Sequence, residues 1–204
     1  MNKSIALAVA IATVSTAAFA QVGTNAGFVL FNNSKVAAPV TFDPLAGGGS
    51  INSANYVAQL FYSTDGTSFS ALGSTAAFSS LPAKAGFWGG NTKNLQFPDA
   101  IHDNQPLTLK VAVWDSTKFA SWDAAVAEST SLQPTATLNA GDKFQIGSST
   151  FAYTTPAFDN LSPDAAYLKN LKTFSLTQYT VTPEPSVVAL GALGLGALLW
   201  RRRK

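Results

Sequence analysis

Hydrophobic and polar residues alternate along the middle of this 204-residue chain, in short segments that turn residues separate. The clearest segment is "PLTLKVAVWD" (106–115). Four aliphatic residues recur there at every second position: Leu107, Leu109, Val111 and Val113. The positions between them carry Thr108, Lys110, Ala112 and Trp114. Because alternate residues of a β-strand point to one face, we expect a strand whose aliphatic face lies in the core.

Similar patterns, enriched in aromatic and β-branched residues, predict further strands along the chain. These strands are expected at 27–33, 38–44, 55–63, 68–78, 86–98 and 171–181. The segment 142–155 is interpreted as two strands around a turn at Gly147-Ser148. Asp65-Gly66 is expected to form a tight hairpin turn between two of the strands.

Two stretches favour short helices. Ser121 is positioned to cap a helix within 119–129, and Ser162 and Pro163 are typical of the first residues of a helix within 162–170. Many short strands with frequent turns predict an all-β protein. We expect an antiparallel β-sandwich, jelly-roll-like or Ig-like, with one or two short helices, over residues 21–180.

The first residues are typical of a secretory signal peptide. Lys3 precedes an apolar stretch at 5–14, and Ala18 and Ala20 have the small-residue spacing of a cleavage site. We therefore expect residues 1–20 to form a hydrophobic helical signal that is removed before Gln21.

The last residues combine an apolar run with a basic cluster. Residues 187–200 carry no charge and would span roughly 21 Å as a helix, whereas a bilayer core needs about 30 Å. Arg201, Arg202 and Arg203 follow directly and favour a cytoplasmic end. Pro183 and Pro185 precede the run and favour an extended, protease-accessible chain. The pattern predicts a short transmembrane segment at 187–200, which is shorter than a permanent membrane span normally is.

This C-terminal segment resembles the PEP-CTERM sorting signal of Gram-negative bacteria. The resemblance rests on Pro183-Glu184-Pro185-Ser186, the apolar run, and the arginines with Lys204, which together make 181–204 the predicted signal. It implies recognition by an exosortase, a membrane-embedded cysteine transpeptidase. It also implies transient anchoring in the inner membrane, cleavage at the motif, and release to the cell surface or extracellular space.

The charge balance argues against nucleic acid as a partner. The whole chain has a formal charge of +2, but residues 21–182 contain eight Lys, no Arg, nine Asp and one Glu, which gives 8 − 10 = −2. The basic residues at the two ends therefore account for the positive total, and no basic patch is expected on the domain. The chain has no cysteine, so disulfides and thiol catalysis are excluded.

Few residues suggest chemistry. His102 is the single histidine and lies near Asp99 and Asp103, which is more typical of a polar loop than of a metal site. The loops at 63–68 and 139–142 could offer oxygen ligands to calcium but are better explained as turns. Paired carboxylates of a glycosidase are not evident, since Glu128 is the only Glu before the tail. We expect no catalytic, cofactor or metal site.

The composition and the two terminal signals favour a non-enzymatic, exported protein of the surface or extracellular matrix. Trp88, Trp114 and Trp122 raise an alternative, a module that binds extracellular polysaccharide by stacking, although core packing is the favoured role of these rings. A weaker alternative is ice or particle binding, which would require a flat row of exposed threonines.

Overall fold

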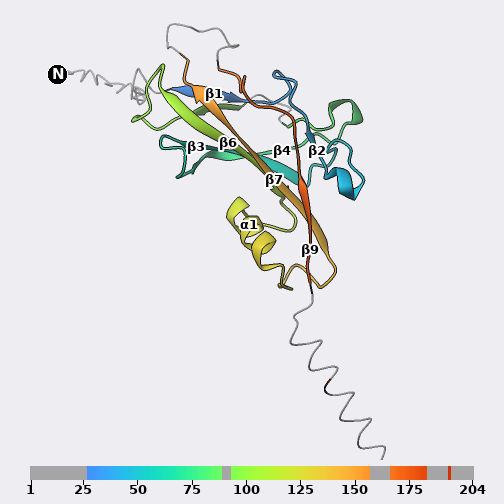
Figure 1. Ribbon diagram of the computed structural model, residues 1–204. Helices are drawn as coiled ribbons and strands as arrows, with labels where there is room; N and C mark the ends of the chain where they lie inside the picture. Colours follow the sequence, from blue (N-terminus) through green and yellow to red (C-terminus); the bar gives the residue numbers. More distant parts are fainter. Residues whose placement is uncertain (1–26, 89–92, 157–165, 183–192, 194–204) are drawn as a thin grey trace, which may run out of the picture.

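A five-stranded antiparallel sheet forms the centre of the protein (Figure 1). The computed structural model describes residues 27–88, 93–156, 166–182 and 193. The strands of this sheet lie in the order β4–β3–β6–β7–β9. They are β3 (Tyr56–Ser63), β4 (Ser70–Ala77), β6 (Pro106–Asp115), β7 (Lys143–Thr154) and β9 (Thr177–Thr180). The predicted antiparallel β architecture is confirmed at this level.

Two short ladders cover one face of this sheet. The first pairs β1 (Phe28–Phe31) with β5 (Lys93–Gln96) in antiparallel register, and the second pairs β2 (Val40–Thr41) with β8 (Phe174–Ser175) in parallel register. The second layer is thus two separate ladders, one of them parallel, rather than a continuous antiparallel sheet. Proline limits β2 at its start, because Pro39 precedes Val40 directly and cannot donate a backbone hydrogen bond. Pro44 opens the 3-10 helix η1 (Pro44–Ala46), and a second one, η2 (Pro82–Lys84), follows later.

The larger hydrophobic core lies between the sheet and the two ladders. Val29 and Phe31 of β1 and Leu60 of β3 belong to it, and each of the three is fully buried. Four aliphatic residues of β6 were predicted to face the core, and all four belong to this larger core. Their exposed fractions are 5% or less: Leu107, Leu109, Val111 and Val113. The predicted face assignment of β6 is therefore confirmed.

A second, smaller core lies on the opposite face, beneath the helix α1 (Trp122–Ser131). The hydroxyl of Ser121 accepts a hydrogen bond from the N–H of Ala124, so the predicted N-cap is confirmed. Trp114 of β6 is 2% exposed, and its Nε1 donates to the carbonyl of Phe119 at 3.1 Å. The favoured core role of Trp114 is thereby confirmed, and this half of β6 is buried on both faces.

The prediction of a turn at Gly147-Ser148 was wrong. Residues 143–154 form one continuous strand, in which Gly147 pairs with Val113 of β6. Close packing favours the glycine, since a Cβ at this position would lie 3.0 Å from Cδ2 of Leu176 and would crowd it. The predicted strand 171–181 is in turn divided at Leu176, where the backbone passes from the ladder with β2 to the edge of the main sheet.

Two further local predictions also differ from the structure. The residues that were expected to start a helix at Ser162 and Pro163 lie outside the described residues, and 166–170 is not helical. Ala166 instead accepts a hydrogen bond from Leu30 of β1, which draws this segment to the edge of the ladder. The β3–β4 connection is also longer than a tight turn and spans residues 64–69, with a positive φ of 76° at Gly66 but not at Asp65.

Candidate functional site

The sheet ends where the predicted sorting segment begins. Val181 follows β9 directly and is 1% exposed, in the smaller core. Its N–H donates to the carbonyl of Asp142 at 2.9 Å, and its carbonyl accepts from the N–H of Gly141 at 2.8 Å. Thr182 donates both its N–H, at 2.9 Å, and its hydroxyl, at 3.2 Å, to the carbonyl of Leu132. The chain is therefore held to the folded domain up to the residue before Pro183.

The residues predicted to carry out sorting lie beyond this junction. Pro183, Glu184, Pro185 and Ser186 are outside the described residues, as are Arg201, Arg202 and Arg203. The same holds for Ala18, Ala20 and Gln21 at the predicted signal cleavage site. Leu193 is the one described residue of the apolar run, and its side chain is exposed. Across the ranges that the structure describes, there is no helix of the length and apolar character needed to cross a membrane.

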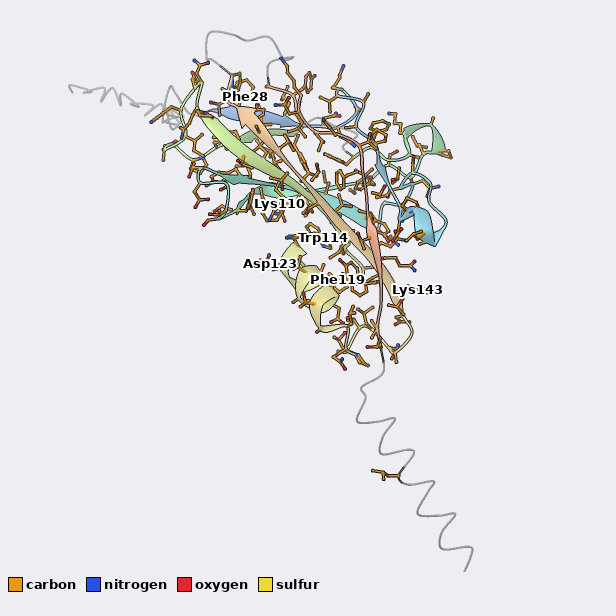
Figure 2. The ribbon with its side chains drawn as sticks, in the orientation of Figure 1. Phe28, Lys110, Trp114, Phe119, Asp123 and Lys143 are labelled. Carbon is orange, nitrogen blue, oxygen red and sulfur yellow. The ribbon has the colours of Figure 1, made fainter. Side chains whose placement is uncertain are left out.

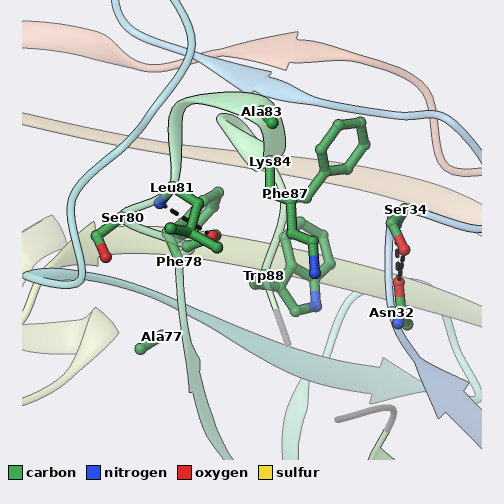
Figure 3. A pocket seen from close by; sticks show the side chains of 11 residues that line it. Asn32, Ser34, Ala77, Phe78, Ser80, Leu81, Ala83, Lys84, Phe87 and Trp88 are labelled. Atoms are coloured by element: carbon green, nitrogen blue, oxygen red, sulfur yellow. Dashed lines mark hydrogen bonds between the residues drawn. The ribbon is translucent and has the colours of Figure 1, made fainter. Parts of the chain in front are cut away.

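A groove with a volume of about 560 Å³ lies on the domain beside Trp88 (Figure 3). Ser34 and Asn32 line one side of it, and Lys84 and Phe87 approach from η2 and the segment after it. The volume lies within the range of small-molecule sites. The lining combines hydroxyl groups, one cation and aromatic rings, which are groups that bind polar ligands with an apolar face.

Trp88 forms the floor of this groove. Its ring contacts Phe31 and Phe78, with centroids 5.1 and 5.7 Å away, and only 1% of the residue is exposed. The indole Nε1 is buried and has no hydrogen-bond partner in the described part of the chain. A buried indole N–H normally finds an acceptor, so this unpaired donor is an exception to the usual pattern.

Asn33 holds the groove in shape, a role that the sequence did not predict. Its side-chain amide donates to the carbonyls of Ala38 and Gly86, both at 2.9 Å, and its Oδ1 accepts from the N–H of Trp88 at 3.0 Å. The side chain is fully buried and thus ties the segment 33–38 to the segment 86–88. The sequence signal was an Asn-Asn pair directly after a strand, which suggested only a strand end.

The predicted histidine and acidic residues do not converge on a metal site. Thr155 donates its hydroxyl to the backbone carbonyl of His102, whose side chain is exposed in the loop before β6. Within the described ranges, no group of three or more His, Cys, Asp or Glu side chains is arranged to hold a metal ion. Glu128 lies on α1, mostly buried against the smaller core.

The two loops considered for calcium use their carboxylates internally. Asp65 accepts from the hydroxyl of Ser63 at 2.7 Å and from the N–H groups of Thr67 and Ser68, each at 2.8 Å. The backbone N–H of Ser68, together with these other donors, lowers the pKa of Asp65. Asp142 accepts from the N–H of Asn139 at 2.8 Å. Both carboxylates therefore act as turn caps.

The three tryptophans do not share one exposed face. Trp88 and Trp114 are buried in different cores, on opposite sides of the sheet, and only Trp122 is partly exposed. Trp122 contacts Trp114 at a centroid distance of 6.4 Å. A sugar-binding surface built from all three rings is thus not present, and of these tryptophans only Trp88 lines the groove described above.

An unexpected arrangement surrounds Lys110 on the helix-side face of β6 (Figure 2). Its Nζ lies 4.9 Å from the ring centroid of Phe61 and 4.4 Å from that of Phe69. Burial beneath these rings lowers the pKa of Lys110, and the Asp123 carboxylate partly opposes that change. The alternating pattern placed Lys110 on the polar face but could not indicate its aromatic neighbours, which come from β3 and the loop before β4.

The comparison with protein families identifies the C-terminal segment. The family model described as the PEP-CTERM protein-sorting motif matches residues 181–204 and confirms the resemblance that the sequence showed. The chain therefore carries the recognition signal for exosortase processing, which implies export and a membrane-associated sorting step. The comparisons with curated proteins and with solved structures give no significant match.

Proposed function

We propose that the chain is a non-enzymatic protein of the cell surface or extracellular matrix. In this proposal residues 1–20 direct export, 187–200 hold the chain briefly in the inner membrane, and exosortase releases the folded domain. The observation that carries the proposal is the match at 181–204, which starts at Val181, the buried residue directly after the last strand of the sheet. The domain is interpreted as a β-sandwich whose second layer is formed by the two ladders.

Replacement of Pro183-Glu184-Pro185 by three alanines tests this function. The apolar run and the arginines remain, so the variant should still be exported and stop in the inner membrane, since hydrophobicity and positive charge govern that step. It should then accumulate uncut. The matched control is deletion of 186–204, which should release a soluble domain that is never held for processing.

Mass spectrometry of the surface-associated wild-type protein gives the decisive reading. A C-terminus near Pro185 supports processing at the motif. An intact chain that still ends at Lys204, together with wild-type behaviour of the alanine variant, would show that the tail is a permanent anchor instead.

The groove beside Trp88 favours one second candidate function, the binding of an extracellular polysaccharide. The half-buried ring of Phe87 offers an apolar surface to a sugar ring, and Ser34, Ser80 and Lys84 offer polar contacts. A glycan array probed with the processed protein tests this candidate. Phe87→Ala should weaken any binding, whereas Leu45→Ala, at an exposed site in η1, should leave it unchanged.

The ice- or particle-binding alternative gains no comparable support. Exposed Thr150 and Thr154 lie on β7, but Ala152 stands between them, and their partners on β6 are Lys110 and Pro106. A regular threonine row is therefore interrupted both along the strand and across it.

A further inference from the structure

We propose that the end of the domain at which the chain leaves the sheet, residues 129–141, docks on the outward-facing surface of exosortase during processing. This inference rests on the proposed function. We call residues 129–141 the exit face. It comprises the last turn of α1 and the loop that follows, which lie at the same end of the molecule as β9 (Figure 1).

The junction leaves little chain between the domain and the membrane. Leu132 binds both donors of Thr182, and only Pro183 to Ser186 separate Thr182 from Val187, where the apolar run begins. Five residue steps span at most about 18 Å when fully extended. A membrane-embedded enzyme that cuts within this interval must therefore approach the exit face closely.

The exit face is suited to contact with a protein. Its thirteen residues, 129–141, include no charged side chain. Several of them are exposed, among them Thr135, Ala136 and Ala140. A surface without charges costs less to desolvate than a charged one, and charged residues are depleted at the centres of protein interfaces.

The same composition disfavours a lipid surface as the partner. Binding to anionic headgroups depends on clustered Lys or Arg, and the exit face has neither. The nearby Lys118 is engaged, because its Nζ donates to the backbone carbonyl of Lys143. We therefore assign the exit face to the enzyme and treat lipid contact as an outcome of the test.

The experiment measures the rate of C-terminal processing in cells by pulse-chase labelling of the full chain. Ala140→Asp and Ala140→Lys each place one charge on the exit face. Both should slow processing by roughly three- to ten-fold, because either charge must be desolvated on docking. Melting temperatures of the variants verify that the domain stays folded.

Two controls isolate docking from other effects. Ala100→Asp places the same charge at the opposite end of the sheet, about 36 Å away along the twelve residues of β7, and should be processed at the wild-type rate. A flexible insertion of about eight Gly and Ser residues between Thr182 and Pro183 separates the motif from the domain by roughly 16 Å. In that background the Ala140 variants should no longer differ from their parent.

The outcomes distinguish the inference from the function on which it rests. Wild-type processing rates in all the exit-face variants would overturn the docking proposal but leave sorting intact. Slowing by Ala140→Asp with acceleration by Ala140→Lys would also overturn it and indicate an anionic lipid surface. Absence of processing in the wild-type chain would instead overturn the proposed function itself.

Discussion

Gly147 and Leu176 lie in contact across the edge of the sheet, with no room for a side chain between them. A Cβ at 147 would lie 3.0 Å from Cδ2 and 3.1 Å from Cα of Leu176, and 3.2 Å from the carbonyl oxygen of Ser175. Two of these three atoms belong to the backbone, so the clash cannot be relieved by a rotamer change alone.

Gly147→Ala should therefore destabilise the domain by about 1–3 kcal/mol, the usual range for overpacking. Urea unfolding followed by tryptophan fluorescence measures the change. The neighbouring exposed Ser148 gives the matched control, because Ser148→Ala should alter stability by less than about 0.5 kcal/mol. Equal stability of the two variants would show that the β7–Leu176 contact is looser than described.

Gly147 also illustrates where sequence reasoning fails for this fold. β6 was predictable because alternation with a period of two is a local property of the chain, and β3 because its enrichment in aromatic and β-branched residues is local as well. The sequence Gly-Ser at 147–148 is a local turn signal, but here the glycine is favoured by close packing with a residue 29 positions later. Burial of both faces of β6 likewise depends on α1, which no pattern within β6 can reveal.

The functional features likewise differ in whether the sequence alone could reveal them. The sorting motif is a linear signal, so the sequence alone was sufficient to identify it. The groove joins Ser34, Lys84 and Trp88 through the buried side chain of Asn33, and its residues come from separate segments. The exit face is defined by the hydrogen bonds of Thr182 to Leu132, fifty residues earlier, and such a contact has no local sequence signal.

Substitutions at adjacent positions of β6 should differ sharply in effect. Val111 is fully buried in the larger core, so Val111→Asp should cost several kcal/mol by burying an unpaired charge. Lys110→Gln should cost only about 0.5–1 kcal/mol, the value of its interaction with Phe61 and Phe69. Chemical denaturation of both variants measures the difference. Similar losses would mean that the two faces of β6 are not distinguished as described.

Alkaline pH should destabilise the domain partly through Tyr56. Burial, with a contribution from the nearby Asp115 carboxylate, raises the pKa of Tyr56 to about 12 in the folded state, whereas the unfolded chain has the ordinary value of about 10. The folded protein thus favours the neutral phenol. The contribution of the Tyr56 phenol to the stability of the folded state is fully present below about pH 10, and it is lost as the pH rises from about 10 to about 12.

Tyr56→Phe should reduce this alkaline loss of stability. Melting temperatures measured between about pH 9 and about pH 12, roughly the range over which an ordinary tyrosine titrates, check this. It should not abolish the loss, because burial also raises the pKa of Tyr153, whose hydroxyl is within hydrogen-bond distance of the carbonyls of Phe28 and Ala166. An unchanged pH profile in Tyr56→Phe would show that this phenol is solvated in the folded state.

Removal of metal ions should leave the melting temperature unchanged. The carboxylate of Asp65 is engaged by one hydroxyl and two backbone N–H groups of its own loop, so it stabilises the β3–β4 connection without an ion. Calorimetry with and without EDTA checks this, and a marked drop with EDTA would revive the calcium interpretation. Asp65→Ala should lower the melting temperature equally in both conditions.

Acidification should weaken the same connection. The hydrogen bonds lower the pKa of Asp65 in the folded state, so its contribution to stability is present above the ordinary carboxyl pKa of about 4 and is lost as the pH falls below it. The Asp65→Ala variant should accordingly lose less stability between about pH 4 and pH 2 than the wild-type protein.

The two buried tryptophans provide a matched pair that isolates one hydrogen bond. Trp88 and Trp114 are both almost fully buried, and replacement of either by phenylalanine removes a similar volume from a core. They differ in the indole N–H, since Trp114 donates to the carbonyl of Phe119 at 3.1 Å, whereas the N–H of Trp88 has no partner among the described residues.

Trp114→Phe should be the more destabilising of the two changes, by about 1–3 kcal/mol, the cost of an unsatisfied buried polar group. It leaves the carbonyl of Phe119 without its indole donor, whereas Trp88→Phe relieves a buried donor that lacks an acceptor. Urea denaturation of the two variants at neutral pH, followed by circular dichroism so that the signal does not depend on the deleted indole, measures the difference. Equal losses would mean that the Nε1 of Trp88 is hydrogen-bonded in solution, for example to water in the groove.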